Sequence, residues 1–261
     1  MMNELTALET AIAERLGTSR EQAFAVLDFD NTCIVNDVGE AALAFICRNH
    51  LLRHGGLLPS GLQDCTGDYH AQVFRYYHRI LEQGDIRGAS LLCARIFAGF
   101  GHDEAAAVMT ATLDEECTIP SESELYGLRI SHGLSVRPVM RKLIDYCAAR
   151  SIAVWIVSAS PALAVEAAMQ RFAIAGNLIA LRHRSENGLL TPEIEEPCSI
   201  AEGKVDCIKA FIDASRPPLL AVGDSIYDLP MVAYAELPAV VERDNALTQE
   251  ARRRGWYVLP S

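Results

Sequence analysis

The sequence is poor in positively charged residues. It has 23 Lys and Arg against 34 Asp and Glu, which gives a formal net charge of −11 at pH 7 and a sequence pI of about 5.1. A chain of this charge repels the phosphate backbone of nucleic acids and the surface of anionic membranes, so we expect neither as a partner. A small anionic substrate stays compatible with this composition, because a local site can be positive within an acidic protein.

Long apolar runs and paired cysteines are also missing. No apolar run reaches the roughly 20 residues that cross a bilayer, and Glu4, Glu9 and Glu14 interrupt the first 16 residues, unlike a signal peptide. The 8 cysteines form no CxxC pair and show no zinc-ligand spacing. We therefore expect reduced cysteines and a cytoplasmic protein without a membrane segment.

Apolar residues make up 50% of the 261 positions, which is enough for one large domain or for a domain with a sizeable insertion. Short apolar runs without alternation are typical of strands buried on both faces. They alternate with helical patterns, which predicts a doubly wound α/β fold with a parallel sheet and right-handed crossovers. Strands are predicted at 21–28, 152–157, 179–181, 188–190, 219–222, 239–241 and 257–259, and helices at 5–16, 138–150, 162–172, 203–212, 228–231 and 245–254.

The α/β pattern is interrupted between Asp37 and Gly133, where we find no convincing strand. Apolar residues at helical spacing predict helices near 41–47, 73–81, 91–97 and 103–117, with a long loop between Gly55 and Gly67. The sequence therefore predicts a catalytic core formed by residues 1–35 and 134–261. An all-helical domain, residues 36–133, is inserted directly after the first acidic turn.

Polar side chains follow three of the predicted strands. Asp28 and Asp30 follow the first strand, Ser158 the second and Asp224 the third. Parallel strands bring their carboxyl ends to one edge of the sheet, where α/β proteins bind their ligands. The stretch around Asp28 alone is equally compatible with a simple turn, since Asp and Asn favour turns. The agreement of three strand ends favours a site.

These side chains suit a phosphate monoester. Magnesium prefers oxygen ligands and can hold a carboxylate and a phosphoryl oxygen together, so Asp28 and Asp224 could share one ion. Ser158 offers a hydroxyl, and amides of the turn at Ala159 could point at phosphate oxygens from a helix amino end. Lys204 could supply a fixed positive charge.

Two carboxylates near one phosphorus could also divide the chemistry. Side chains at positions i and i+2 of an extended chain point the same way, so Asp28 and Asp30 could both face the phosphate. A carboxylate nucleophile splits the hydrolysis into two easier steps through an aspartyl-phosphate. Asp30 could protonate the leaving oxygen and later deprotonate water.

Four segments resemble, in order, the four motifs of the haloacid dehalogenase (HAD) superfamily, and the helical insertion resembles the C1 cap of that family. The resemblance implies that Asp28 is the nucleophile, that Asp30 is the general acid and base, and that Ser158 and Lys204 bind phosphate. It also implies Mg²⁺ bound by Asp28, the backbone carbonyl of Asp30, and Asp224, with Asp228 in support. The segments are Asp28-Phe29-Asp30-Asn31-Thr32, Val157-Ser158-Ala159-Ser160, Gly203-Lys204 and Gly223-Asp224-Ser225-Ile226-Tyr227-Asp228.

Within this superfamily the chain is similar to phosphoserine phosphatase-like and phosphorylcholine phosphatase-like enzymes. The second acid, Asp30, favours the phosphatase branch. Asp37 holds the position of a glutamate that, in the phosphoserine enzymes, binds the substrate ammonium, although it could equally cap the helix that begins at Val38. Tyr227 replaces an asparagine of the phosphoserine enzymes, and the residues after Ser158 look more like the phosphorylcholine type.

We therefore expect magnesium-dependent hydrolysis of a small phosphorylated metabolite. Two alternatives stay open, namely transfer of the phosphoryl group to an acceptor alcohol and non-catalytic binding of a phospholigand. Asp228 could be a plain helix cap and Lys204 a solvated residue at a helix start. The 7 histidines are expected to be solvated or satisfied, and the oligomeric state is not predicted. Three large aromatic residues could in principle form a cage around a quaternary ammonium group, but we expect them in the core: Tyr76, Tyr77 and Trp155.

Overall fold

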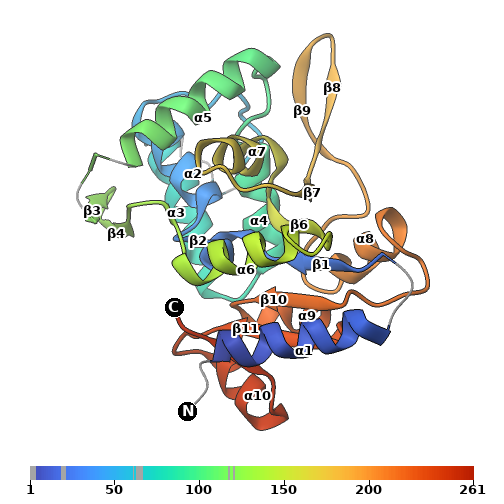
Figure 1. Cartoon of the computed structure of the whole chain (residues 1–261). Helices are drawn as coiled ribbons and strands as arrows, with labels where there is room; N and C mark the ends of the chain where they lie inside the picture. The colour runs from blue at the N-terminus through green and yellow to red at the C-terminus, as the bar shows by residue number, and fades with distance from the viewer. Residues whose placement is uncertain (1–3, 19–21, 61, 63–66, 117, 120) are drawn as a thin grey trace.

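The computed structural model describes residues 4–18, 22–60, 62, 67–116, 118–119 and 121–261 (Figure 1). Its centre is a six-stranded sheet with the order β12-β11-β10-β1-β6-β7, in which every paired neighbour is parallel. The predicted doubly wound α/β core is thus confirmed. Its strands are β1 (Phe24–Leu27), β6 (Ala153–Pro161), β7 (Asn177–Leu181), β10 (Leu220–Gly223), β11 (Leu237–Val241) and β12 (Tyr257–Leu259).

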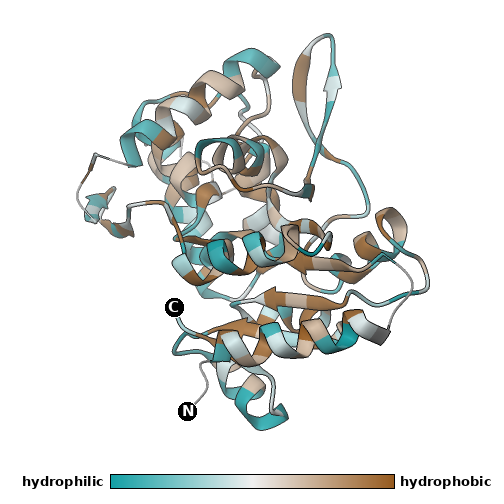
Figure 2. Ribbon diagram, viewed as in Figure 1, coloured by the Kyte–Doolittle hydropathy of each residue, from teal (hydrophilic) through white to brown (hydrophobic). Residues whose placement is uncertain are grey.

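Both faces of the sheet are covered, which explains why its strands lack alternation. Ala25 and Leu27 of β1 face one apolar cluster, whereas Phe24 and Val26 face another. Figure 2 shows the strands of this sheet largely in the brown of apolar residues. The first face packs against α1 (Glu4–Thr18), α6 (Pro138–Ala148) and α7 (Ala162–Arg171), and the second against α8 (Gly203–Phe211), α9 (Leu229–Tyr234) and α10 (Ala246–Arg254).

A helical insertion follows β1, after a tight turn, η1 (Phe29–Cys33), and the short strand β2 (Ile34–Val35). Three of its helices begin at an aspartate whose side chain accepts a hydrogen bond from a backbone N–H of the first turn. These aspartates are Asp37, Asp68 and Asp85. Strand β2 pairs with β5 (Ser135–Val136), so the segments that enter and leave the insertion lie side by side. The helices are α2 (Val38–Arg48), α3 (Tyr69–Glu82), α4 (Ile86–Arg95) and α5 (His102–Glu116).

The expectation that no strand occurs between residues 37 and 133 is wrong. Strands β3 (Glu122–Leu125) and β4 (Leu128–Ser131) form an antiparallel hairpin at the end of the insertion. A second hairpin, β8 (His183–Glu186) with β9 (Leu189–Ile194), was predicted only at 188–190. Both ribbons are largely exposed, so their strands lack the apolar alternation that marks a strand packed on a core.

Other boundaries differ by a few residues. Strand β6 continues to Pro161, beyond the predicted end at Val157. The predicted first residue of the first strand, Glu21, and part of the predicted loop between Gly55 and Gly67 lie outside the described residues. Among the residues that the structure describes, no helix is long and apolar enough to span a membrane. Six cysteines are free and buried, and Cys65 and Cys117 lie outside the described part of the chain: Cys33, Cys47, Cys93, Cys147, Cys198 and Cys207.

Candidate active site

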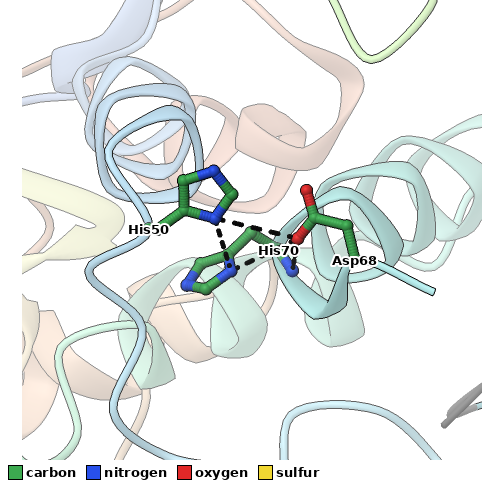
Figure 3. Close-up of side chains that lie close together, drawn as sticks. All are labelled: His50, Asp68 and His70. Carbon is green, nitrogen blue, oxygen red and sulfur yellow. Dashed lines mark hydrogen bonds and ion pairs between the residues drawn. The ribbon is translucent and has the colours of Figure 1, made fainter. Parts of the chain in front are cut away.

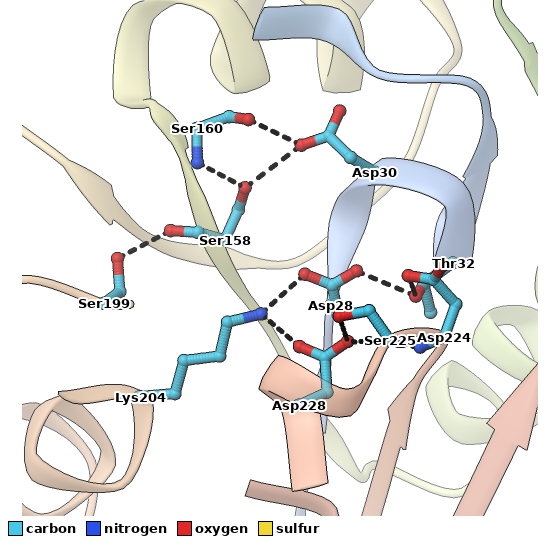
Figure 4. A network of polar contacts seen from close by, with 10 residues as sticks. All are labelled: Asp28, Asp30, Thr32, Ser158, Ser160, Ser199, Lys204, Asp224, Ser225 and Asp228. Carbon is cyan, nitrogen blue, oxygen red and sulfur yellow. Dashed lines mark hydrogen bonds and ion pairs between the residues drawn. The ribbon is translucent and has the colours of Figure 1, made fainter. Parts of the chain in front are cut away.

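The site is built around the turn that follows β1. The backbone N–H of Asp28 donates to the carbonyl of Val222 in β10 (2.9 Å), which holds the aspartate at the carboxyl end of the sheet. Asn31 adopts a left-handed conformation (φ 57°), so the chain reverses directly after the second acid. The Thr32 hydroxyl then lies 2.8 Å from Asp28 Oδ2 and 3.1 Å from Asp224 Oδ1 (Figure 4). A single hydroxyl therefore joins two strand ends.

Lys204 lies on the other side of Asp28. It belongs to the first turn of α8, yet its side chain is only 3% exposed. Its Nζ donates to Asp28 Oδ1 and to Asp228 Oδ1, both at 2.6 Å. The alternative of a solvated lysine at a helix start does not describe this residue. Burial acts to lower the pKa of Lys204, but the charges of Asp228 and Asp28 outweigh burial and raise it, so the ammonium stays charged.

Asp228 is held at both of its carboxylate oxygens. Oδ2 accepts the backbone N–H of Ser225 (3.1 Å) and that of Asp224 (3.2 Å), while Oδ1 faces Lys204. Gly223, the last residue of β10, leaves room for this arrangement, because a Cβ at that position would overlap the Asp228 side chain. Asp228 thus fastens the turn after β10, and it does so as a member of the charged cluster.

Asp224 has two partners that the sequence interpretation missed. Arg243 Nη1 donates to Asp224 Oδ2 (2.9 Å), and Asn245 Nδ2 donates to the Asp224 backbone carbonyl (2.7 Å). Both residues follow β11, the neighbour of β10 in the sheet. The signal was available, since a fourth parallel strand must also bring its carboxyl end to this edge.

Asp30 faces the insertion. Its Oδ1 accepts the backbone N–H of Val38, in the first turn of α2 (2.7 Å), and its Oδ2 accepts the Ser160 hydroxyl (2.7 Å). The Ser158 hydroxyl lies 3.3 Å from the same oxygen, and Ser158 is fully buried. Ala159 and Ser160, but not Ser158, line the cavity of the site. In this structure Ser158 therefore orients Asp30, and the phosphate-binding role predicted for its hydroxyl stays a prediction.

The carboxylates of the cluster resist ionisation. Burial, followed by the charge of Asp228, raises the pKa of Asp28 to about 6, although Lys204 acts in the opposite direction. Burial and the charge of Asp28 raise the pKa of Asp224 to about 7. Burial, with the charge of Asp37, also raises the pKa of Asp30. The cluster thus carries more negative charge than its two cations, Lys204 and Arg243, neutralise.

This excess of negative charge fits a hard cation. Asp28, Asp224 and Asp228 are buried, and each offers a carboxylate oxygen within 4.8 Å of the others. Oxygen donors without nitrogen or sulfur are the set that Mg²⁺ prefers. Burial is the main cause of the raised pKa values of Asp28 and Asp224, and a divalent ion between these oxygens would offset the repulsion that adds to it.

A cavity of about 340 Å³ opens above these groups. The strand ends form its floor, with Asp28, Asp30, Lys204 and Asp224 among the lining residues. Asp37 both lines this cavity and caps α2, where it accepts the Glu40 backbone N–H (2.8 Å), so its two predicted roles are compatible. The insertion supplies the opposite wall through Asp37, Glu40, Tyr77, Leu81, Ile86, Ala89, Ser90 and Cys93.

Comparison with known families agrees with this geometry. Residues 25–233 match the model of the haloacid dehalogenase-like hydrolases, a span that holds all four motif segments. The chain belongs to this family. HAD-family membership also places the buried Asp28, Asp224 and Asp228 cluster in a fold whose members are typically magnesium-dependent.

Individual proteins show how far the similarity extends. A protein of Mycobacterium tuberculosis named as a probable phosphatase is 38% identical over 88 residues, which is 33% of this chain and 30% of that protein. The chain therefore spans less than a third of that relative. A structure from Anaerococcus prevotii of unknown function has a TM-score of 0.70 at 20% identity, covering 97% of this chain and 90% of that one. A substrate-bound phosphoserine phosphatase has a TM-score of 0.55 at 13% identity, covering 89% and 91%.

Proposed function

We propose that this HAD-like hydrolase is a magnesium-dependent phosphatase that hydrolyses a small phosphate monoester through an aspartyl-phosphate. One observation carries the proposal: Lys204 and Thr32 fix the two oxygens of Asp28 on the floor of a cavity that Asp30 also lines. A nucleophile, a second acid and a cation therefore meet in one small space. The names of the M. tuberculosis relative and of the phosphoserine phosphatase structures support the same reaction class.

In the first step an oxygen of Asp28 attacks phosphorus and the ester bond breaks. Protonated Asp30 donates its proton to the departing alkoxide, which leaves as a neutral alcohol. In the second step Asp30, now a carboxylate, takes a proton from water, and the resulting hydroxide attacks the aspartyl-phosphate. The acyl phosphate bond breaks, inorganic phosphate leaves, and Asp28 is restored as a carboxylate. The raised pKa of Asp30 keeps its proton available for the first step.

Asp28, Asp224 and the backbone carbonyl of Asp30 would hold the magnesium ion, with Asp228 supporting the set. When bound, the ion supplies positive charge that offsets the phosphoryl oxygens and the surrounding carboxylates. Lys204 adds a second positive charge beside Asp28, suited to a phosphate oxygen. The backbone amide of Ala159, which lines the cavity shortly before α7 begins at Ala162, would donate to the same phosphate.

Residues 36–133 would act as a cap on a core of residues 1–35 and 134–261. The insertion contributes the wall of the cavity that faces the strand ends, and its first turn contacts Asp30 through the Val38 amide. Movement of this segment would expose the site to substrate and then exclude water during the first step. The free buried cysteines are consistent with action in the reducing cytoplasm.

The substrate class follows from the charge of the cap wall. Asp37 and Glu40 line the cavity, and no Lys or Arg of the insertion's described residues does so. An ester that carries an amine or another cationic group, like phosphoserine or phosphorylcholine, would place that group against these carboxylates. Only one aromatic ring of the insertion, that of Tyr77, is among the described lining residues, so a primary amine fits better than a caged quaternary ammonium.

The test is a comparison of phosphate esters with Mg²⁺ present. Phosphoserine, phosphoethanolamine, phosphorylcholine and glycerol phosphate are matched in size and differ in their cationic group. Release of phosphate with a covalently phosphorylated Asp28, detected by mass spectrometry after rapid quenching, is the expected result. Transfer of the phosphoryl group to added alcohol at the expense of phosphate release would replace hydrolysis by a phosphotransferase. Absence of turnover with every ester would overturn the proposal.

A further inference from the structure

A second cluster of potential metal ligands lies in the insertion, away from the carboxylates of the active site. His50 follows the end of α2, whereas Asp68 and His70 lie at the start of α3 (Figure 3). The sequence analysis expected every histidine to be solvated or satisfied. His50 and His70 are 20 positions apart in the sequence. We propose that His50, Asp68 and His70 form a binding site for a transition-metal ion of the zinc type.

The three donor atoms converge on one point. His50 Nδ1 lies 3.1 Å from His70 Nδ1, Asp68 Oδ1 lies 3.4 Å from His70 Nδ1, and His50 Nδ1 lies 3.9 Å from Asp68 Oδ1. Ligands of a tetrahedral zinc ion at ordinary bond lengths are separated by about 3.4 Å. The observed triangle therefore needs only small side-chain shifts to become one face of a zinc tetrahedron.

The arrangement of the two imidazole rings also supports a metal site. The two imidazoles form a T-shaped pair with their Nδ1 atoms 3.1 Å apart, ring planes 79° apart and centroids at 4.6 Å. At most one of these facing nitrogens can carry a proton that the other accepts, so one favourable hydrogen bond is the best the metal-free pair achieves. A metal ion would bind both lone pairs at once. Neutral imidazole nitrogen and carboxylate oxygen are common zinc ligands.

The backbone prepares this geometry. Asp68 Oδ1 accepts the His70 backbone N–H (2.9 Å) as the cap of α3, which fixes the carboxylate beside the second histidine. His50 has a left-handed backbone conformation (φ 54°), directly past the helix end, where glycine is the usual residue. Its side chain is 61% exposed, so an ion could reach the cluster from solvent. The three protein ligands leave one tetrahedral position for water.

We expect metal binding to cross-link helices α2 and α3. The site joins the end of α2 to the start of α3 and would close the loop between His50 and Asp68, residues 51–67. Helix α2 carries Asp37 and Glu40 of the cavity wall, and α3 carries Tyr77. Metal binding would stabilise the wall of the cap without taking part in the reaction.

The experiment is a Zn²⁺ titration of the full chain by calorimetry, with Mg²⁺ at millimolar concentration to occupy the carboxylate site. We expect one zinc ion with micromolar or tighter affinity. Because the His50 side chain is largely exposed, we expect His50→Ala to fold, so it is the main variant, and its zinc affinity should fall by more than about tenfold. His54→Ala, from the same connection but outside the cluster, is the matched control and should bind zinc as the wild type does.

A spectroscopic measurement separates this site from the catalytic one. Bound Cu²⁺ should show electron-spin couplings to two imidazole nitrogens in the wild type and in Asp28→Asn, and to fewer in His50→Ala. Because the active-site cluster offers only oxygen, those couplings do not depend on whether the protein is a phosphatase. Zinc affinity weaker than about 100 µM, or binding that His50→Ala leaves unchanged, would show a hydrogen-bonded cluster only and would overturn the proposal.

Discussion

The floor and the wall of the cavity are built in opposite ways. On the floor, Asp28, Asp224 and Asp228 are each less than a tenth exposed, and each is fixed by a partner from another segment. On the wall, about a third of the Glu40 side chain is exposed. The imidazole of His78 lies 3.6 Å from its carboxylate, but burial lowers the pKa of His78 and so disfavours its charged form. A substitution on the floor therefore disturbs several groups, whereas one at Glu40 changes fewer contacts. This difference supports our proposal that the floor carries the chemistry and that the wall selects the substrate.

Asp28→Asn replaces the central carboxylate of the floor and should have the largest effect on activity. The amide is a poor nucleophile, so kcat should fall by about 10⁴-fold or more. Lys204 keeps its bond to Asp228, and the fold should be retained. Phosphate release and circular dichroism measure the two properties on the same sample. Turnover within tenfold of the wild type would remove Asp28 from the mechanism.

Asp30→Asn should come next, with an effect that depends on the leaving group. The asparagine oxygen can still accept the Val38 amide, so substrate binding should change little. An alkyl phosphate needs a proton on its departing oxygen, and we expect its kcat to fall by about 10²–10⁴-fold. An aryl phosphate with an acidic phenol should lose less in its first step. Equal losses for both esters would argue against a general acid at this position.

Glu40→Gln tests the wall with a much smaller effect. We expect KM for an amine-bearing ester to rise about tenfold at pH 8 with kcat nearly unchanged, which corresponds to about 1.4 kcal/mol of lost attraction. Glycerol phosphate, which has no cation, is the control substrate, and its KM should not move. Were kcat to fall instead for both substrates, Glu40 would belong with the catalytic groups of the floor.

The pH dependence of substrate affinity and of stability in the wild type and in Glu40→Gln sharpens this test. Burial, with the charges of Asp37 and Glu116, raises the pKa of Glu40 to about 7, and His78 faces it from α3. Glu40 therefore becomes anionic between pH 6 and 8, and affinity for a cationic ester should increase over that range. Stability should change in the opposite direction. The unfolded carboxyl ionises first, near its ordinary pKa of 4.5, so folding stability falls from there up to about pH 7.

Glu40→Gln should remove both trends. Between pH 5 and pH 8, the unfolding free energy of the variant should rise relative to that of the wild type. Because solvent screens the partly exposed carboxylate, this relative gain should be only about 1 kcal/mol. Denaturant unfolding at the two pH values measures it. A wild type and variant with parallel pH profiles would mean that another group causes the trend.

The same contrast bears on what the sequence could predict. Asp28, Asp30 and Asp224 follow strongly apolar strands, so the order of elements predicted them at one edge of the sheet. Lys204, at a helix start, was assigned to the site from its charge and from the family resemblance. The end of a fourth parallel strand pointed to this edge of the sheet, but Arg243 was missed because the pattern of apolar residues does not reveal that β11 lies beside β10. Asp30 was predicted beside Asp28, and the structure shows it lining the same cavity, but its contact with Val38 depends on how the insertion folds back over the turn.

The insertion was harder to predict for a physical reason. Its helices bury apolar stripes and were found, but the hairpin of β3 and β4 is exposed and polar, so no period of two in hydropathy marks it. The pairing of His50 with His70 depends on the path of the connection between α2 and α3. Contacts of this kind depend on tertiary geometry, which a local pattern does not contain.

Arg87→Gln should give the smallest effect and tests how the two regions meet. Arg87 Nη2 lies 3.0 Å from Glu196 Oε1 and links α4 of the insertion to the core, with side chains 55% and 65% exposed. Exposed ion pairs contribute less than about 1 kcal/mol, so the variant should change stability slightly and KM by less than about threefold. Arg253→Gln, which breaks the exposed pair with Glu250 inside α10, is the matched control. A tenfold rise in KM for Arg87→Gln alone would mean that this pair holds the insertion over the site. The wall of the cavity would then depend on the core for its position, as the floor does.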